Sequence, residues 1–468
     1  MPKIMKIWDR DNESIALQER IEFMRDVTGG TRHMRKIAKE KGYLPQFPSE
    51  DSKDYETRLN ITVFEPFTFD ATISANGKIF AKKPTLLELP EEFEKHDIIN
   101  NFDRDGTDIY KFANELNKIQ ITEGIAFVYT AFPSTKTNIV SLNKQMRPYA
   151  RIIKGDQIIS KRYVVDNGRK VLYQIVISEK INENDGDFGQ IGIVQYRRIF
   201  IDNAEIKYEV YRKIEEQQKL IEQGIIRISG QTEYAKIPIE PCYAVQKGYM
   251  LSVSPFEELG HLNVEHFQKM SDFNMSYHLS GANTPVIIGN IINANPAKDV
   301  AEQRQTQVGG ASILNLEQGG KFEWVSGSTQ LQPMSDHIEK REQRMKAMAF
   351  DVVDGGNKTA TQIKDERADK EAKLNMIALN LEDCLNATLK NMADFMRIDL
   401  KKGRIEINKD FNLTVMPIED LQTYSNFVTE GKISHETFLK EAQKGERLLT
   451  IDSIEDEKEL ATREFEVE

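Results

Sequence analysis

The residues best suited to chemistry lie in the short segment HLNVEH, which begins at His261 and ends at His266. Two histidines and a glutamate that share a helix face are a common way to hold a zinc ion. Inverted zinc motifs place two residues between the first histidine and the Glu-His pair, whereas this segment has three. His261 and Glu265 could share a face, but His266 points about 100° away from Glu265 on a helix. The segment therefore predicts a polar helix face and no metal site.

The rest of the chain contains no familiar catalytic pattern. Seven histidines are scattered through 468 residues, and the sequence has no Gly-x-Ser-x-Gly elbow and no phosphate-binding glycine loop. Cys242 and Cys384 lie far apart and have no ligand-like spacing to a histidine, so we expect no disulfide and no zinc site. We expect ordinary turns at the isolated glycine pairs, which are Gly29-Gly30, Gly309-Gly310, Gly319-Gly320 and Gly355-Gly356. The sequence thus predicts no catalytic residue and no cofactor, although an enzyme stays open because active sites assemble from residues distant in sequence.

Charge is concentrated at one end of the chain. The net charge is −11, and residues 452–468 contain eight acidic and two basic residues, so this tail carries −6 and the rest of the chain −5. Proteins that grip nucleic acid usually run basic, so tight DNA binding is disfavoured, while loose passage of a polyanion is not. No apolar run reaches the roughly 18 residues of a transmembrane helix, and the N-terminus is polar where a signal peptide would be apolar. We therefore expect a protein made and used in a cytoplasm, with no membrane partner.

The first half of the chain has the pattern of a mixed α+β domain. Helical periodicity covers residues 14–41, with a break at Gly29-Gly30, and then residues 54–80 and 105–120. We expect the basic cluster in the first segment to be a solvated helix face rather than a DNA contact; its members are Arg32, Arg35, Lys36, Lys39 and Lys41. After residue 120, β-branched and aromatic runs alternate with turn residues, as in antiparallel strands. These runs are GIAFVYTAF, YARIIKG, KVLYQIVISE, GIVQYRRIFI and AEIKYEVYRKI.

The second half predicts two helices on either side of a compact insertion. Pro255 opens the first helix, and the second follows from about Ser335 to Phe350. The insertion between them contains the expected strands VIIG and SILNL, the polar piece AKDVAEQRQTQ and the turn LEQGGKFEW. Helices that leave and return around an insertion tend to lie antiparallel, which places the insertion at the far end of a stalk. Near the C-terminus we expect a hairpin in RIEINKDFNLTVM and two short helices in IEDLQTYSNFVTEGKISHETFLKEAQKG.

The most distinctive element is a predicted helix of 38 residues over residues 359–396. Eight of the ten residues from Lys364 to Lys373 are charged, which indicates a solvated first half. The second half carries an apolar stripe at helical spacing, made of Leu374, Ile377, Ala378, Leu381, Leu385, Leu389, Met392, Ala393 and Met396. At 1.5 Å per residue the helix would span about 57 Å, more than one small domain needs. Either it reaches across an assembly, or it is a long amphipathic surface helix of an ordinary large protein.

The order of these segments resembles a tailed-phage portal protein of a portal-like type found mainly in prophages. The resemblance covers nearly the whole chain, and its soft patterns gain specificity from their shared order. They are Gly42-Tyr43-Leu44-Pro45 with YETRL, GKIF before Lys83-Pro84, ITEGIAFVYTAFP, RPYARII, SPFEELGHLNVEHFQKMSDF, GANTPVIIG, the long helix and VTEGKISHETFLKE. The resemblance implies a portal fold with a mixed α/β wing, a helical stem, a small α/β clip, a long tunnel helix and a short helical crown.

The resemblance also assigns a part to each segment. Residues 1–254 would be the wing, 255–281 the first stem helix, 282–333 the clip, 334–350 the second stem helix, 351–358 the tunnel loop, 359–416 the long helix and wing return, and 417–468 the crown and acidic tail. Portals form rings, typically of twelve subunits, at one capsid vertex of the virion. Double-stranded DNA passes through the ring, and terminase, head-tail adaptors, and major capsid and scaffolding proteins are the implied partners.

Two groups of residues follow as candidate sites. The tunnel loop would place Asp354, Gly355, Gly356, Asn357 and Lys358 beside passing DNA, unless it is an ordinary tight turn between helices. The clip would dock the motor through the apolar residues Ile313, Leu314, Phe322 and Trp324, some of which, above all Trp324, could instead hold the small core of the clip. The alternatives to a portal are a head-tail adaptor or minor head protein and, with less support, a cytoplasmic enzyme.

Overall fold

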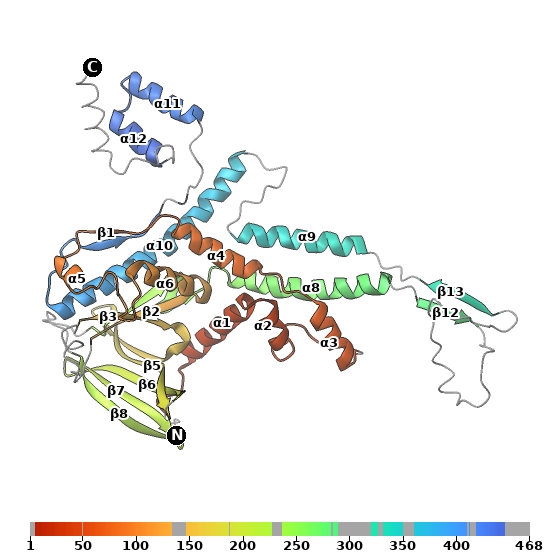
Figure 1. Cartoon of the computed structure of the whole chain (residues 1–468), viewed down its shortest axis with the longest axis horizontal. Helices are drawn as coiled ribbons and strands as arrows, with labels where there is room; N and C mark the ends of the chain where they lie inside the picture. Colours follow the sequence, from red (N-terminus) through yellow and green to blue (C-terminus); the bar gives the residue numbers. More distant parts are fainter. Residues whose placement is uncertain are drawn as a thin grey trace. The chain divides into compact units, whose positions relative to one another are not determined.

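The computed structural model describes residues 5–48, 50–132, 147–186, 188–226, 236–281, 284–288, 320–325, 331–349, 360–409, 411 and 418–444. It divides into two compact units, Met1–Ile407 and Asn408–Glu468. The larger unit contains both the α+β body and the predicted stalk (Figure 1). The smaller unit contains the two short C-terminal helices that the sequence predicts, α11 (Ile418–Thr429) and α12 (His435–Lys444).

Four helices begin the larger unit: α1 (Asn12–Thr28), α2 (Gly30–Ile37), α3 (Ser52–Ile61) and α4 (Phe67–Ile79). Asp11 caps α1 by accepting a hydrogen bond from the Ser14 amide, and a break follows at Gly30, whose φ is +74°. The single helix expected over residues 54–80 is wrong, because α3 and α4 are separate. Thr62 is extended after α3, and Pro66 both lacks an amide hydrogen and disfavours helical geometry in the residue before it.

The helix expected from residue 105 instead begins at Ile109, as α6 (Ile109–Glu123), after the short α5 (Glu91–Lys95). Asp108 is its N-cap and accepts from the Lys111 amide, and a carboxylate at this position is favourable for a helix start. The helix ends at Gly124, whose φ is +85°. A Cβ atom at Gly124 would lie 2.5 Å from the Ser254 amide nitrogen, so this position needs glycine both for its backbone angle and for the close approach.

Antiparallel strands follow, as the sequence predicts, in two main sheets. One has the order β3-β2-β9, and its strands are β2 (Ile125–Ala131), β3 (Tyr149–Lys154) and β9 (Ile239–Tyr243). The other is a meander in sequence order, made of β4 (Ile158–Asp166), β5 (Arg169–Asp185), β6 (Gly189–Asp202), β7 (Glu205–Ile214) and β8 (Gln217–Ile226). The sequence analysis missed β4, β8 and β9. A 3₁₀ turn, η1 (Gly155–Gln157), joins β3 to β4.

The main hydrophobic core lies between these two sheets. Phe127 and Tyr129 of β2 meet Ile199 of β6 and Tyr208 of β7 there, and Leu17 of α1 closes one end. The opposite face of the three-stranded sheet is covered by α6 and by α10 (Ala360–Met396), which packs on β9 and β2. The stripe residues of α10 from Leu374 to Ala393 are buried, whereas Met396 is half-buried. The predicted long helix is therefore confirmed, since α10 starts one residue later than expected and ends at the expected residue. Its apolar stripe is buried as predicted up to residue 393.

The hairpin expected in residues 404–416 has residues 412–416 outside the described part of the chain, and its first strand is present. This strand, β14 (Arg404–Glu406), pairs antiparallel with β1 (Thr85–Leu87), more than 300 residues earlier in the chain. Asn386 of α10 fixes it by donating to the Ile405 carbonyl and accepting from the Ile405 amide. Two further short strands, β10 (Val245–Gly248) and β11 (Leu251–Val253), form a ribbon just before the stalk. None of the described helices has the length and apolar character that crossing a membrane requires.

Candidate functional site

The predicted stalk is built from two antiparallel helices, α8 (Glu257–Gly281) and α9 (Leu331–Met348), which lie side by side (Figure 1). Arg341 and Glu265 form an ion pair of 3.1 Å between them. His266 of α8 is buried and its Nε2 lies 3.2 Å from Glu342 Oε1 of α9, so the proton that this contact needs sits on Nε2. These two adjacent contacts fix the register of the helix pair.

A two-stranded ribbon connects the two helices. It consists of β12 (Thr284–Ile288) and β13 (Lys321–Val325), paired antiparallel from Thr284 with Val325 to Ile288 with Lys321. Only two residues separate α8 from β12, and five separate β13 from α9. Because an extended chain spans at most about 3.6 Å per residue, the ribbon must lie at the end of the helix pair where α8 stops and α9 starts.

Two sequence predictions change at this end of the stalk. The segment KFEW was expected in a turn, but it belongs to β13, where its β-branched and aromatic neighbours favour a strand. The second helix was expected from residue 334, but α9 starts at Leu331 and includes Pro333 in its first turn. Proline is tolerated there because amides of the first turn have no partner within the helix. The last residues of the predicted clip range, 282–333, therefore belong to α9.

The candidate site residues from the sequence fall largely beyond the described part of the chain. Asp354, Gly355, Gly356, Asn357 and Lys358 lie outside the described residues, as do Ile313 and Leu314 and the predicted strand SILNL. Phe322 and Trp324 lie on β13, where Trp324 is the backbone partner of Pro285 and Phe322 that of Ile287. The tunnel loop and the docking residues of the clip therefore remain predictions.

The base of the stalk is held by a buried arginine that the sequence analysis did not single out. Arg58 of α3 is nearly inaccessible, and its guanidinium donates two hydrogen bonds of 2.7 Å to the two carboxylate oxygens of Glu50. It also donates to the hydroxyl of Ser271 on α8, at 3.1 Å, and stacks on the ring of Phe47. Hydrogen bonds from Arg58 lower the pKa of Glu50 below its ordinary value of 4.5. The Arg58–Glu50 ion pair and the Arg58–Ser271 hydrogen bond together hold α3 and the loop before it against α8.

A buried asparagine ties a second helix to the same base. Asn263 of α8 accepts hydrogen bonds from the Thr68 amide and hydroxyl, and its amide donates to the Glu65 carbonyl. Asn263 thereby satisfies backbone groups at the start of α4 that no residue of α4 caps. On the other side, Gly260 of α8 lets α1 approach closely, because a Cβ there would lie about 3 Å from Phe23 and Val27. The base of α8 is therefore enclosed by three helices.

The HLNVEH segment lies in this base and its two histidines point to different neighbours. His266 faces Glu342 and the edge of Phe67, whereas His261 stacks on Phe23 with 4.2 Å between ring centroids. The divergence agrees with the angle expected from helix geometry. Among the described residues, no three His, Cys, Asp or Glu side chains gather in a way that could hold a metal ion.

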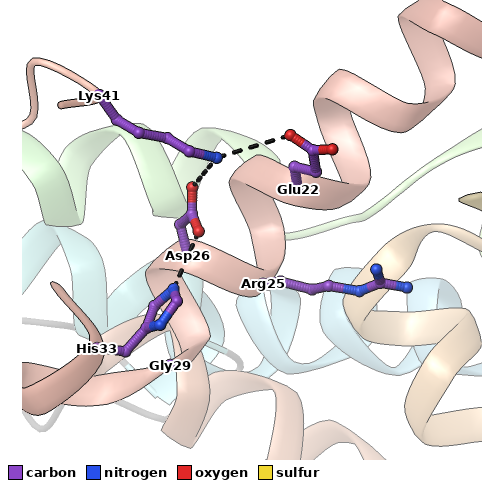
Figure 2. A pocket seen from close by; sticks show the side chains of 6 residues that line it. All are labelled: Glu22, Arg25, Asp26, Gly29, His33 and Lys41. Carbon is purple, nitrogen blue, oxygen red and sulfur yellow. Dashed lines mark hydrogen bonds and ion pairs between the residues drawn. The ribbon is translucent and has the colours of Figure 1, made fainter. Parts of the chain in front are cut away.

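A small charged pocket of about 320 Å³ lies between α1 and the segment that follows it. Figure 2 shows Asp26 between Lys41 and His33, while Arg25 points away. Asp26 contacts His33 at 3.0 Å and Lys41 at 2.8 Å, and it accepts a hydrogen bond from the Tyr43 hydroxyl. The Lys41 hydrogen bond to Asp26 raises the pKa of Lys41. These groups satisfy one another, so the pocket offers neither a free nucleophile nor a vacant ligand.

Arg25 links three elements on the far side of α1. Its guanidinium forms two hydrogen bonds to Asp156 of η1, at 2.7 and 2.9 Å, and one of 2.8 Å to Glu123 at the end of α6. Burial would raise the pKa of Asp156, but the hydrogen bonds from Arg25 outweigh it and lower that pKa. Burial raises the pKa of Glu123 despite the same arginine. The arrangement fixes α1 and the end of α6 to the turn between β3 and β4.

Residues 255–396 match the model of a family described as a domain of unknown function, DUF4055. The matched segment runs from two residues before α8 to the last residue of α10, so it covers the stalk and the long helix and leaves out the α+β body. No curated protein matches the chain.

The chain is also similar to one chain of a solved structure described as "Neck of native GTA particle computed with C12 symmetry". The two share 10% sequence identity with a TM-score of 0.43, over 86% of this chain and 96% of that chain. A likeness of this size carries no conclusion about function.

Proposed function

We propose that the chain is the subunit of a phage-type portal, a ring at one capsid vertex of the virion through which double-stranded DNA is packaged and ejected. In this proposal the ring has twelve subunits. Terminase and head-tail connector proteins dock on it, and major capsid and scaffolding proteins surround it. The protein acts as a structural conduit and not as an enzyme.

One observation carries the proposal: the antiparallel pair α8 and α9 ends in a small β-ribbon and is followed by one long helix. This is the order of stem, clip and tunnel helix that the sequence resemblance implies. The base of the pair is anchored in the body by the buried contacts of Arg58 and Asn263, while Tyr277 and His278, near the other end of α8, are exposed. A stalk fixed at one end and projecting at the other suits a part that meets partners outside the capsid shell.

Subunit contacts are proposed along α8, α9 and the free face of α10. α9 has only Ile338, Met345 and the following Ala349 buried, and most of its remaining side chains are exposed or half-exposed. On α10, Met376 and Leu379 are large apolar residues left 42% and 43% exposed. Apolar side chains on a helix that is otherwise well packed are the surface a neighbouring subunit would cover.

The assembly is tested by electron microscopy and analytical ultracentrifugation of the purified full chain. Rings with a central hole, in place of a 53.8 kDa species, are expected. Compact monomers at high protein concentration, with no assembly on adding salt or scaffolding protein, would contradict the proposal. Rings without a stalk projection would favour another capsid-associated structural protein.

The clip is proposed to dock terminase during packaging and tail adaptors afterwards. The relevant variant replaces residues 284–325 with a short Gly-Ser linker, which leaves α8 and α9 intact. Rings should still form, and binding to the terminase encoded with this protein should be lost. A linker of equal composition in the β5–β6 turn, at residues 186–188, serves as the matched control and should bind normally. Normal packaging by the clip variant would refute the docking assignment.

The loop of residues 351–358 is proposed to line the narrowest part of the channel. Gly355 and Gly356 would give the loop backbone freedom, and Asn357 and Lys358 would offer weak polar contacts to a passing phosphate. Replacing both glycines with valine should leave rings intact but lower DNA packaging or retention. Lys358→Ala should have a mild effect, because it removes one phosphate contact per subunit. Gly77→Val on the exposed side of α4 is the control, since nothing lies within 4 Å of that position.

A further inference from the structure

The five-stranded sheet has two open edges, and the first is β8. Within the described part of the chain, this strand pairs only with β7, the Ile7 amide donates to the Gln218 side chain near its start, and eight of its ten residues are exposed. Leu220, Ile221 and Ile225 are its exposed apolar residues, each 43–44% exposed, while Ile226 packs against the core. Edge strands are normally protected by shortness, proline or several lysines. β8 has ten residues, no proline and one lysine, so it is a long and weakly protected edge.

The second open edge is the end of β4, on the opposite side of the same sheet. The start of β4 is covered by the N-terminal segment, because the Asp11 amide donates to the Ile159 carbonyl and the Lys161 amide donates to the Asp11 side chain. Among the described residues, the hydrogen bonds from this N-terminal segment to β4 end at Lys161. From Arg162 to Val165 every residue is exposed, and Val164 and Val165 are 48% and 66% accessible.

The two open edges carry opposite charge. Residues 162–170, from the end of β4 through the turn into β5, contain three basic residues and one acidic residue. Residues 215–226, from the β7–β8 turn through β8, contain three acidic residues and one basic residue, with Glu216 also paired to Lys213 beside the turn. Two apolar strand edges of opposite charge on opposite sides of one sheet favour contact between unlike edges and disfavour contact between like edges.

We propose that β8 of one copy of this chain pairs with the exposed end of β4 of the next copy, so that the sheets of neighbouring subunits join edge to edge around the ring. The inference rests on the proposed portal assembly and names a surface through which neighbouring subunits of the ring contact each other. A contact between two different edges is heterologous, and heterologous contacts generate rings when their rotation closes. Main-chain hydrogen bonds give such strand addition its strength, and the exposed valines and isoleucines bury their side chains against each other.

Engineered cysteines in the full chain test the pairing. Native Cys242 and Cys384 are buried, so they do not compete for an oxidant. Val165→Cys is made in one preparation, and Ile221→Cys or Ile225→Cys in another, so that a register offset of a few residues is covered. Equal amounts are mixed, assembled and oxidised. A covalent dimer of unlike chains is expected, and the variant with both Val165→Cys and Ile221→Cys should give a ladder of higher multimers.

Controls separate the specific contact from random collision. Phe188→Cys lies at the fully exposed tip of the β5–β6 hairpin, and it should give at least tenfold less cross-link with Val165→Cys than Ile221→Cys does. Val165→Cys alone should not cross-link to itself. If it does, the edges meet in a two-fold manner and the proposal is overturned.

The ring and the edge contact fail in distinguishable ways. Rings in the micrographs without any cross-link from residue 165 to 221 or 225 would overturn the edge pairing and leave the portal proposal standing. Absence of both rings and cross-links would remove both. As an independent check, Ile221→Lys with Ile225→Lys should raise the protein concentration needed for ring formation at least tenfold, whereas Phe188→Lys should not change it. An unchanged assembly midpoint in the lysine variant would also count against the pairing.

Discussion

The two main sheets differ in how completely one subunit can bury them. All seven residues of β2 in the three-stranded sheet are buried, because α6 and α10 cover one face and the five-stranded sheet covers the other. In the five-stranded sheet, burial falls away toward β8, where eight of ten residues are exposed. One subunit therefore buries β2 completely but leaves the edge strand β8 exposed. An exposed strand edge of this kind is where contact with another subunit would form.

The two faces of β6 repeat the contrast on neighbouring residues. Arg197 points inward and forms a 2.7 Å ion pair with Glu179, in which both side chains are mostly buried. Arg198 lies on the opposite face, where it forms a partly exposed pair with Glu209 at 3.0 Å and donates to the buried Gln174. Because side chains of a strand alternate between faces, consecutive arginines enter very different environments.

The largest loss of stability should come from a substitution in the buried core around β2. Phe127→Ala on β2 removes a ring that is 1% exposed and leaves a cavity, so we expect a loss of about 3–5 kcal/mol in the free energy of unfolding. Ile221→Ala on β8 should change the stability of the single subunit by less than about 0.5 kcal/mol. Urea unfolding of both variants at a concentration where the chain is monomeric checks this. Equal losses would mean that β8 is packed within one subunit.

The two arginines of β6 should differ next. Arg197→Ala leaves the buried Glu179 carboxylate without its charged partner and with only the hydrogen bond from Gln195, which should cost about 3 kcal/mol. Arg198→Ala breaks a partly exposed pair and should cost about 0–1 kcal/mol. Thermal and urea unfolding give the two values. A larger loss for Arg198→Ala would contradict the assignment of its pair with Glu209 as a weak, partly exposed one.

Acid should act on the buried pair at the base of the stalk. The pKa of Glu50 is lowered in the folded protein, so its ion pair with Arg58 contributes stability above the unfolded value of 4.5 and loses it as the pH falls through the lower folded value. Glu50→Gln should therefore lose stability relative to the parent chain at pH 7 and approach it at pH 3. Unfolding free energies at several pH values between 3 and 7 test this, and a difference that does not depend on pH would contradict it.

The smallest effect is expected for the reactivity of the two native thiols, Cys242 and Cys384. Cys384 of α10 donates to the Glu240 carbonyl of β9, and Cys242 lies two residues further along the same strand face. A hydrogen bond with Cys242 raises the pKa of Cys384, and burial adds to the shift. Neither thiol should react with a thiol reagent at pH 8 until urea is added, while an introduced Val165→Cys should react at once. Fast reaction of the native chain would show that α10 detaches from the sheet.

Sequence reasoning succeeded where the signal was local. The apolar stripe of α10 and the antiparallel β-rich segment depend on spacing within one element, and both are present. It failed for β8, whose QQKLIEQGII is polar because the strand lies at an edge. It also missed the pairing of β14 with β1, since no local pattern reveals which distant strand will be the partner.

The candidate site shows the same division. The helix–insertion–helix order of the stalk could be predicted from the sequence, and the structure contains α8, the ribbon and α9 in that order. The contacts that anchor it could not be predicted, because Arg58 and Asn263 look like ordinary surface residues until α3, α4 and α8 meet around them. Of the loop and clip residues expected to meet DNA and the motor, Phe322 and Trp324 fall on a described element, the strand β13.

Because α10 is one continuous helix, a movement of its packed part would be carried along the helix to its first residues. Its buried stripe from Leu374 to Ala393 is clamped between β9, β2 and α6, while 14 residues extend before the clamp to Ala360. That extension is about 21 Å long at 1.5 Å per residue, and a helix is stiff over this distance. A tilt of about 5° within the clamp would move Ala360 by about 2 Å. A small repacking against the sheet would thus be magnified at the segment that precedes the helix.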